Sequence, residues 1–215
     1  MQEFVPVVSA TGKRLMPTTH RRANKLIVKK RALRRFDRGL FYIQPVDRQD
    51  GYTQPTAIGI DPRSHKEAFT VKSATHTYLN IQADAVTWTK EHIATRRQMR
   101  RTRRYRKTPY RQYRPNRRKN KKFLPPSTWA RWNWKLRLSH WLVRYYPITA
   151  FAVEDIAAIT KRGKKLWNLH FTPLEVGKHR FYAELAEIAP VYTYKGYETN
   201  GQIRINANNL FRQWA

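Results

Sequence analysis

A dense cationic tract in the middle of the chain places the strongest constraint on the fold. Lys or Arg fills 15 of the 27 positions from residue 96 to residue 122, and no acidic residue interrupts them. Such a segment is expected outside any apolar core, because unpaired charges are costly to bury. Its first part, to about Lys107, is predicted to be a helix, and Pro109 and Pro115 then force bends or an extended path.

The composition of this tract is typical of nucleic-acid binding. Arginine and lysine at this density neutralise phosphates and release their counterions, and the guanidinium group can grip a phosphate with two hydrogen bonds. Tyr105, Tyr110 and Tyr113 lie among the cations and can stack on unpaired bases. A solvated charged face or a disordered tail is the alternative. A tail, however, would not normally lie mid-chain between core-like segments.

The whole chain is also strongly basic. Its 44 Lys and Arg against 14 Asp and Glu give a net charge of +30, so a polyanion is expected in the working state. Hydrophobic residues make up 40% of the chain, which argues against a disordered polycation. No apolar run is long enough for a membrane span, and no cysteine is present for disulfides or thiolate chemistry. We therefore expect a cytoplasmic protein that binds nucleic acid and has no membrane role.

The segment before the tract is predicted to fold in two parts. Residues 1–48 read as a small αβ unit: a strand and a turn at the start, a helix over residues 20–36 that Thr18 or Thr19 can cap, and a strand at "GLFYIQPV". A polar linker, "DRQDGYTQP", follows. The runs "TAIGID", "EAFTVKSA" and "TYLNIQADA" then predict an antiparallel meander.

The segment after the tract alternates helices and strands. Ser127 can cap a mostly apolar helix, "TWARWNWKLRLSHWLVRYY", which we expect to be buried. The apolar run "ITAFAVEDI" is typical of a central parallel strand. Thr172 and Pro173 can begin another helix, and "PVYTYKGYE" reads as a last strand. The sequence therefore predicts an α/β fold.

Two carboxylates stand at the ends of predicted strands. If the strands of Asp61 and Glu154 are neighbours, the two side chains converge at one edge of the sheet, as in Mg²⁺ sites for phosphoryl transfer. On spacing alone the signal for a metal site is weak, because strand ends followed by an acid are common and Asp61-Pro62 also fits an ordinary turn. Asp155 follows Glu154 directly, so strand alternation predicts that it points to the opposite side. The seven histidines show no metal-ligand spacing.

Four motifs, in order, resemble a known family. The stretch around "RLMP" is similar to a PLMP module, "IGIDP" to the first RuvC motif, the Arg-rich segment to a bridge helix, and "FAVEDI" to the second RuvC motif. Together they resemble the RRXRR proteins of the IscB/IsrB group of transposon-associated, RNA-guided nucleases. The chain is most similar to the IsrB branch, because no HNH domain interrupts the segment after "FAVEDI".

The resemblance implies a ribonuclease-H-like, RuvC-type mixed sheet and an RNA-guided DNA endonuclease or nickase that uses Mg²⁺ for phosphodiester hydrolysis. Its parts would be a PLMP-like module (1–48), RuvC-like part I (49–95), the bridge helix and basic tract (96–122), RuvC-like part II (123–200) and a divergent tail (201–215). The expected partners are a structured guide RNA and target DNA, bound by a monomeric protein. The implied metal ligands are Asp61 and Glu154, and the expected nucleic-acid contacts are Arg21, Arg22, Lys25, Arg96, Arg97, Arg100, Arg101, Arg103, Arg104, Tyr105, Arg106 and Lys107.

The sequence departs from the family pattern in two places. Arg63 stands after Asp61-Pro62, where the family commonly has Gly. A third RuvC motif, with a His and an Asp on a helix, has no counterpart after Glu198, and we expect the metal site to lack that ligand. The alternatives are a truncated copy of a longer nickase, or a remnant that binds structured RNA without cutting.

Overall fold

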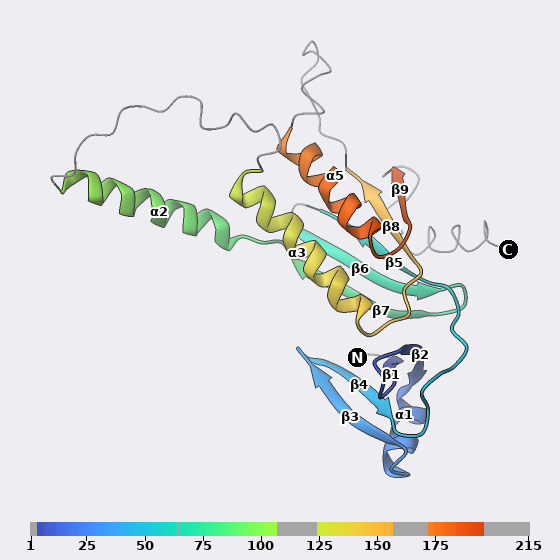
Figure 1. Cartoon of the computed structure of the whole chain (residues 1–215). Coiled ribbons are helices and arrows are strands. Elements are labelled where there is room, and N and C mark those ends of the chain that lie inside the picture. Colours follow the sequence, from blue (N-terminus) through green and yellow to red (C-terminus); the bar gives the residue numbers. More distant parts are fainter. Residues whose placement is uncertain (1–3, 64, 107–123, 157–171, 196–215) are drawn as a thin grey trace.

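The protein has a mixed α/β fold (Figure 1). The computed structural model describes residues 4–63, 65–106, 124–156 and 172–195. Within these ranges the chain forms four helices and two mixed sheets. None of the helices in the described ranges is long and apolar enough to cross a membrane.

The first sheet comes from the N-terminal segment. Its strand order is β2-β1-β4-β3, with β1 (Phe4–Val8) parallel to β4 (Leu40–Pro45) and the other pairs antiparallel. The strands β2 (Arg14–Thr19) and β3 (Ala32–Asp37) form the two edges. Helix α1 (His20–Val28) packs Ala23, Leu26 and Ile27 against this sheet, and Thr19 caps it as predicted by accepting a hydrogen bond from the Arg22 backbone N–H.

The predicted helix over residues 20–36 is too long. Helix α1 ends at Val28, and Lys30 takes a left-handed conformation with φ of 56° that breaks it. Residues 32–37 instead form β3, which pairs with β4 through a two-residue turn at Arg38 and Gly39, both with positive φ. That turn geometry matches the twist of a hairpin. The basic side chains of β3 suit an exposed edge strand, because charge there discourages pairing with other chains.

Strand β2 was not predicted, because only one strand and a turn were expected before the first helix. Pro17 lies within β2, at the edge of the sheet, where the register with β1 shifts between Val5 and Val7. Proline lacks the backbone N–H that a central strand must donate, so an edge or a bulge is where a strand tolerates it.

The second sheet has five strands in the order β7-β6-β5-β8-β9. As predicted, β5 (Thr56–Asp61), β6 (Lys66–Ser73) and β7 (Thr77–Asp84) form an antiparallel meander. Strand β8 (Ala150–Asp155) is parallel to both β5 and β9 (Val191–Lys195), which confirms the prediction of a buried parallel strand. Strands β5 and β8 are therefore neighbours at the centre of the sheet.

Two helices cover one face of this sheet (Figure 1). They are α3 (Pro126–Val143) and α5 (Pro173–Ala186), and α5 begins after Thr172, whose hydroxyl accepts a hydrogen bond from the Glu175 backbone N–H. Helix α3 begins at Pro126, the favoured first-turn position for proline, so Ser127 is not its cap. The core between the helices and the sheet includes Ile58, Ile60, Phe69, Phe151, Val153, Leu136, Leu142, Phe181 and Leu185.

The expectation of a buried α3 holds for one side of the helix. Trp132, Leu136 and Leu142 are buried, whereas Trp129 is 39% exposed. Helices α3 and α5 pack closely, because a Cβ atom added at Gly177 would lie only 2.1 Å from Nε1 of the Trp132 indole. Glycine at this position therefore lets the two helices approach.

The two sheets are in contact. The Tyr145 hydroxyl, just after α3, donates a 2.6 Å hydrogen bond to Oδ2 of Asp37 on β3, and the Tyr145 ring packs on Tyr42 of β4. Phe4 of β1 packs edge-on against Tyr78 of β7. The domain boundaries inferred from the sequence remain a prediction.

Candidate functional site

Asp61 and Glu154 lie side by side at one edge of the five-stranded sheet. Strands β5 and β8 are parallel, and their paired register ends at Ile60 and Val153, one residue before the two acids. Because parallel strands end at the same edge, both carboxyl groups are delivered to one place. The convergence expected for neighbouring strands is therefore present, since β5 and β8 are neighbours.

The two carboxyl groups lie close enough for the charge of one to affect the other. Burial of the Glu154 carboxyl, together with the negative charge of Asp61, raises the pKa of Glu154 above its ordinary value. Oε2 of Glu154 is buried and makes no hydrogen bond with the described residues. A buried carboxylate oxygen without a donor is energetically costly, and a cation between the two acids would remove that cost.

Arg63 supplies a positive charge to this site in the structure. Its Nε lies 2.7 Å from Oδ2 of Asp61, and the Arg63 side chain is 62% exposed while that of Asp61 is 8% exposed. In the sequence, Arg63 stood out only as a departure from the family pattern at a turn. A contact between residues two apart at a strand end was not foreseen. An exposed guanidinium group can move away when another cation arrives, because little packing holds it.

Asp155 belongs to the opposite side of the strand, as alternation predicts. Its Oδ1 lies 3.0 Å from the Lys178 Nζ and accepts a 3.1 Å hydrogen bond from the Tyr182 hydroxyl, both on α5. Lys178 also pairs with Glu175 at 2.7 Å. Asp155 is thus held by α5 on the side away from Asp61 and Glu154.

The two carboxylates fit a hard divalent cation, although they provide only two ligand side chains. Carboxylate oxygens are the ligands that Mg²⁺ prefers, and Asp61 and Glu154 present them from rigid strands. Among residues 4–63, 65–106, 124–156 and 172–195, no group of three or more His, Asp or Glu side chains could hold a metal ion. The segment in which a third motif was sought, after Glu198, lies outside the described residues.

A buried ion pair near this edge was missed by the sequence analysis. Lys135 Nζ on α3 lies 2.6 Å from Oε1 of Glu67 on β6, and the two side chains are 5% and 1% exposed. Burial raises the pKa of Glu67 and lowers that of Lys135, and the charge of Asp61 adds to the shift at Glu67. The two residues are 68 positions apart in sequence, so no local pattern could have paired them.

Helix α2 (Trp88–Tyr105) carries the predicted basic surface. It extends away from the sheet, and Thr89 is its only buried residue (Figure 1). The arginines predicted to bind nucleic acid are all exposed, as is Tyr105, at 83%. No ion pair joins the following residues to an acidic side chain within the described ranges: Arg96, Arg97, Arg100, Arg101, Arg104 and Arg106.

The other predicted nucleic-acid contacts lie on a different element. Arg21, Arg22 and Lys25 are exposed on α1, at the first sheet. The predicted set is therefore divided between two helices that belong to different parts of the fold. Lys107 lies outside the described residues.

The fold and the site define a class of protein: a basic, mixed α/β protein with two acids meeting at the edge of a sheet and an exposed arginine helix. A family model described as "RRXRR protein" matches residues 5–165. The chain belongs to the RRXRR protein family. No curated protein matches it.

Proposed function

We propose that this RRXRR protein is an RNA-guided DNA endonuclease or nickase of the IscB/IsrB kind, with a RuvC-type, ribonuclease-H-like nuclease fold. Family membership is consistent with such proteins. The observation that carries the proposal is the meeting of Asp61 and Glu154 on adjacent parallel strands, with an unpartnered buried oxygen on Glu154. The order of the sheet, with an antiparallel meander followed by parallel strands, also supports it.

In this proposal Asp61 and Glu154 hold Mg²⁺ at the edge of the sheet. Mg²⁺ supplies positive charge to the scissile phosphate and lowers the pKa of a bound water. The strands keep the two carboxylates rigid and adjacent, so that little reorganisation is needed when substrate arrives. Arg63 neutralises Asp61 when the cation is absent. When the cation is bound, the exposed guanidinium of Arg63 can turn toward a DNA phosphate.

Helix α2 supplies the second part of the function. Arg96, Arg97, Arg100, Arg101 and Arg104 of this helix are exposed and form no ion pair with the described residues, so phosphates of the guide RNA and of its duplex with DNA can reach them. Tyr105 offers a ring for an unpaired base. Base pairing between the guide RNA and the target DNA then selects the target sequence, and the protein needs no base-specific contacts of its own along the duplex.

A nicking assay tests this proposal. The full chain would be purified with the RNA encoded beside its gene and incubated with a supercoiled target plasmid and Mg²⁺. Wild type is expected to nick one strand, and Asp61→Ala is expected to lose nicking while it keeps RNA binding. Equal nicking by the two proteins would exclude Asp61 as a metal ligand. Asp155→Asn is the matched control, because its side chain lies on the α5 side.

A second candidate function is a structured-RNA-binding protein that does not cut. The observation that favours it is the ion pair of Arg63 with Asp61, combined with only two converging acids in the described part of the chain. Wild-type protein that binds the RNA, shows a steep salt dependence and never nicks would support this function instead.

A further inference from the structure

A pocket in the N-terminal unit is distinct from both the carboxylate pair and α2. It has a volume of about 280 Å³ and lies between β2, the start of α1 and the polar segment after β4. Leu15, Met16 and Pro17, three residues of the "RLMP" motif, line it together with Val7 and Leu26. The motif, whose role the proposed function leaves open, thus forms the floor of a cavity.

The rim of this N-terminal pocket is cationic. Arg22, Arg31 and Arg48 line it against a single acid, Asp47. Arg31 is paired with Asp47 at 3.3 Å, which leaves Arg22 and Arg48 as the positive charges available to a ligand. Helix α1 begins beside the pocket, and its first turn has no acidic residue. Both features favour an anionic group at the rim.

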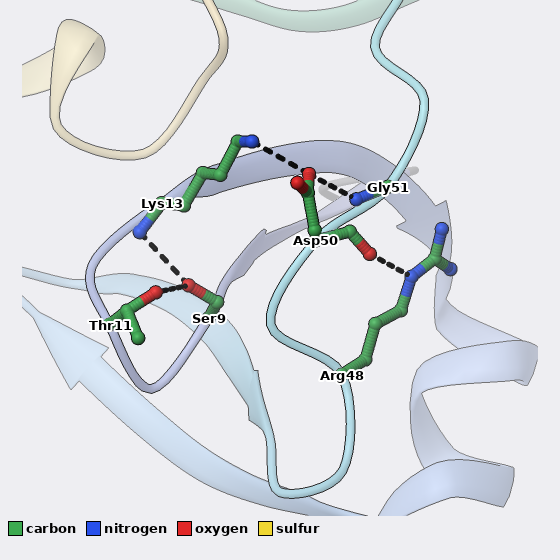
Figure 2. A network of polar contacts seen from close by, with 6 residues as sticks. All are labelled: Ser9, Thr11, Lys13, Arg48, Asp50 and Gly51. Atoms are coloured by element: carbon green, nitrogen blue, oxygen red, sulfur yellow. Dashed lines mark hydrogen bonds and ion pairs between the residues drawn. The ribbon is translucent and has the colours of Figure 1, made fainter.

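A network of polar contacts holds Arg48 in place (Figure 2). Its Nε donates a 2.9 Å hydrogen bond to the Asp50 carbonyl. The Asp50 carboxylate in turn pairs with Lys13 at 2.7 Å and accepts a hydrogen bond from the Gly51 backbone N–H. Figure 2 shows the terminal nitrogens of Arg48 on the side of the guanidinium away from Asp50. Within the described residues these terminal nitrogens make no hydrogen bond or ion pair, so their donors are available to a ligand.

An aromatic side chain completes the rim. Tyr52 lines the pocket and is 82% exposed, so its ring is open to a flat partner. The segment that carries Tyr52 is attached to the floor, because the Gln54 backbone N–H donates to Sδ of Met16 at 3.3 Å. A flexible thioether is a good floor for a planar, polarisable ring.

We propose that the N-terminal pocket binds one unpaired nucleotide of a single-stranded nucleic acid. The base packs on Met16 and Tyr52, and Arg22 and Arg48 bind its phosphate. A free phosphate would use the arginines and leave the apolar floor empty, whereas a nucleotide uses both. The strong positive charge of the chain draws such strands to it. The site does not depend on the metal or on cleavage, so it stands or fails separately from the proposed function.

The test compares two short strands at physiological salt, each made in RNA and in DNA form. One five-residue strand carries a single central uracil with abasic positions elsewhere, and the other is abasic throughout. The full chain is expected to bind the uracil strand at least about five-fold more tightly, from the usual contribution of base stacking. Tyr52→Ala should lower this ratio and leave only the part that the exposed ring of Tyr105 on α2 supplies. Phe36→Ala, which removes another exposed aromatic ring, should keep it.

The outcomes are distinct. A uracil preference that is as large in Tyr52→Ala as in wild type, or no preference for the uracil strand in either arm, would overturn the proposal. A preference in the RNA arm alone assigns the pocket to an RNA nucleotide, and one in the DNA arm alone assigns it to DNA. Either result supports a nucleotide pocket.

Gly51→Ala tests the phosphate contact without a change in net charge. A Cβ atom at Gly51 would lie 2.2 Å from a terminal nitrogen of Arg48, so the guanidinium must move. Gly51 is not in the left-handed region, and the backbone therefore tolerates alanine. Loss of a charge-assisted hydrogen bond should weaken binding of both strands by roughly ten-fold and leave the uracil preference intact. Unchanged affinity would contradict a phosphate contact that depends on this placement of the Arg48 guanidinium.

Discussion

Replacement of Lys135 by Met probes the buried ion pair that fixes α3 beside the candidate site. The substitution keeps an unbranched apolar side chain and removes the ammonium group that lies 2.6 Å from Oε1 of Glu67. Glu67 is 1% exposed, and its second oxygen has no hydrogen-bond partner among the described residues. The carboxylate would therefore be buried without a counter-charge. Breaking a buried pair in this way costs about 3–5 kcal/mol.

The loss should depend on pH. Burial already raises the pKa of Glu67 above its ordinary value of 4.5, and loss of Lys135 raises it further. The folded variant then keeps a proton that the unfolded chain releases above pH 4.5. Its stability therefore falls as pH rises through and above that value. The deficit relative to wild type should be smallest near pH 4.5 and should grow as the pH rises toward 8.

Urea unfolding, followed by tryptophan fluorescence, measures the free energy of unfolding at both pH values. The matched control is the double variant Glu67→Leu/Lys135→Met, which replaces the pair with apolar side chains and should recover most of the loss. A single variant that loses less than about 1 kcal/mol at pH 8, or a double variant as unstable as the single one, would refute the reasoning.

Three further changes have defined outcomes. Gly177→Ala should lower the free energy of unfolding by about 1–3 kcal/mol in urea titrations, because the new Cβ overpacks Trp132, and an unchanged value would contradict the close approach of α3 and α5. Tyr145→Phe removes the donor whose hydrogen bond lowers the pKa of Asp37, so NMR titration should show that pKa rise, and no rise would contradict the contact. Arg63→Ala removes the cation that competes for the candidate metal site, so calorimetry should show tighter Mg²⁺ binding, and weaker binding would show that Arg63 supports the metal.

The central sheet was predictable because its patterns are strong and local. The run before Asp61 and the run before Glu154 are continuous and apolar, and both form buried strands of one sheet. That identification placed each acid at the end of a strand, and the structure shows that the two strands are neighbours. The opposite orientation of Asp155 followed from strand alternation alone.

The errors came from residues whose local preference was overridden. Pro17 is compatible with a strand only because β2 is an edge, and a sequence does not reveal which strand is at an edge. The "ALRRF" run is basic enough for an exposed helix, but the hairpin turn at Arg38 and Gly39 pairs it with β4. The N-terminal pocket was missed for a different reason. The residues that line it come from separate elements, so no local sequence pattern marks it.

The side-chain contacts of the candidate site could not be predicted from the sequence either. The sequence could supply two acids, but it could not show that Arg63 folds back on Asp61 or that Lys135 reaches Glu67 from α3. Both contacts depend on side-chain geometry at strand ends. They set the charge that a metal or a phosphate would meet.

Divalent-cation binding tests the central claim most directly. Mn²⁺ would be titrated into the full chain and free Mn²⁺ measured by electron paramagnetic resonance, with wild type compared with Asp61→Asn, Glu154→Gln and the control Asp155→Asn. The account predicts one site in wild type that both Asp61→Asn and Glu154→Gln abolish and that Asp155→Asn keeps. Mn²⁺ binding that is unchanged in Asp61→Asn and Glu154→Gln would contradict it.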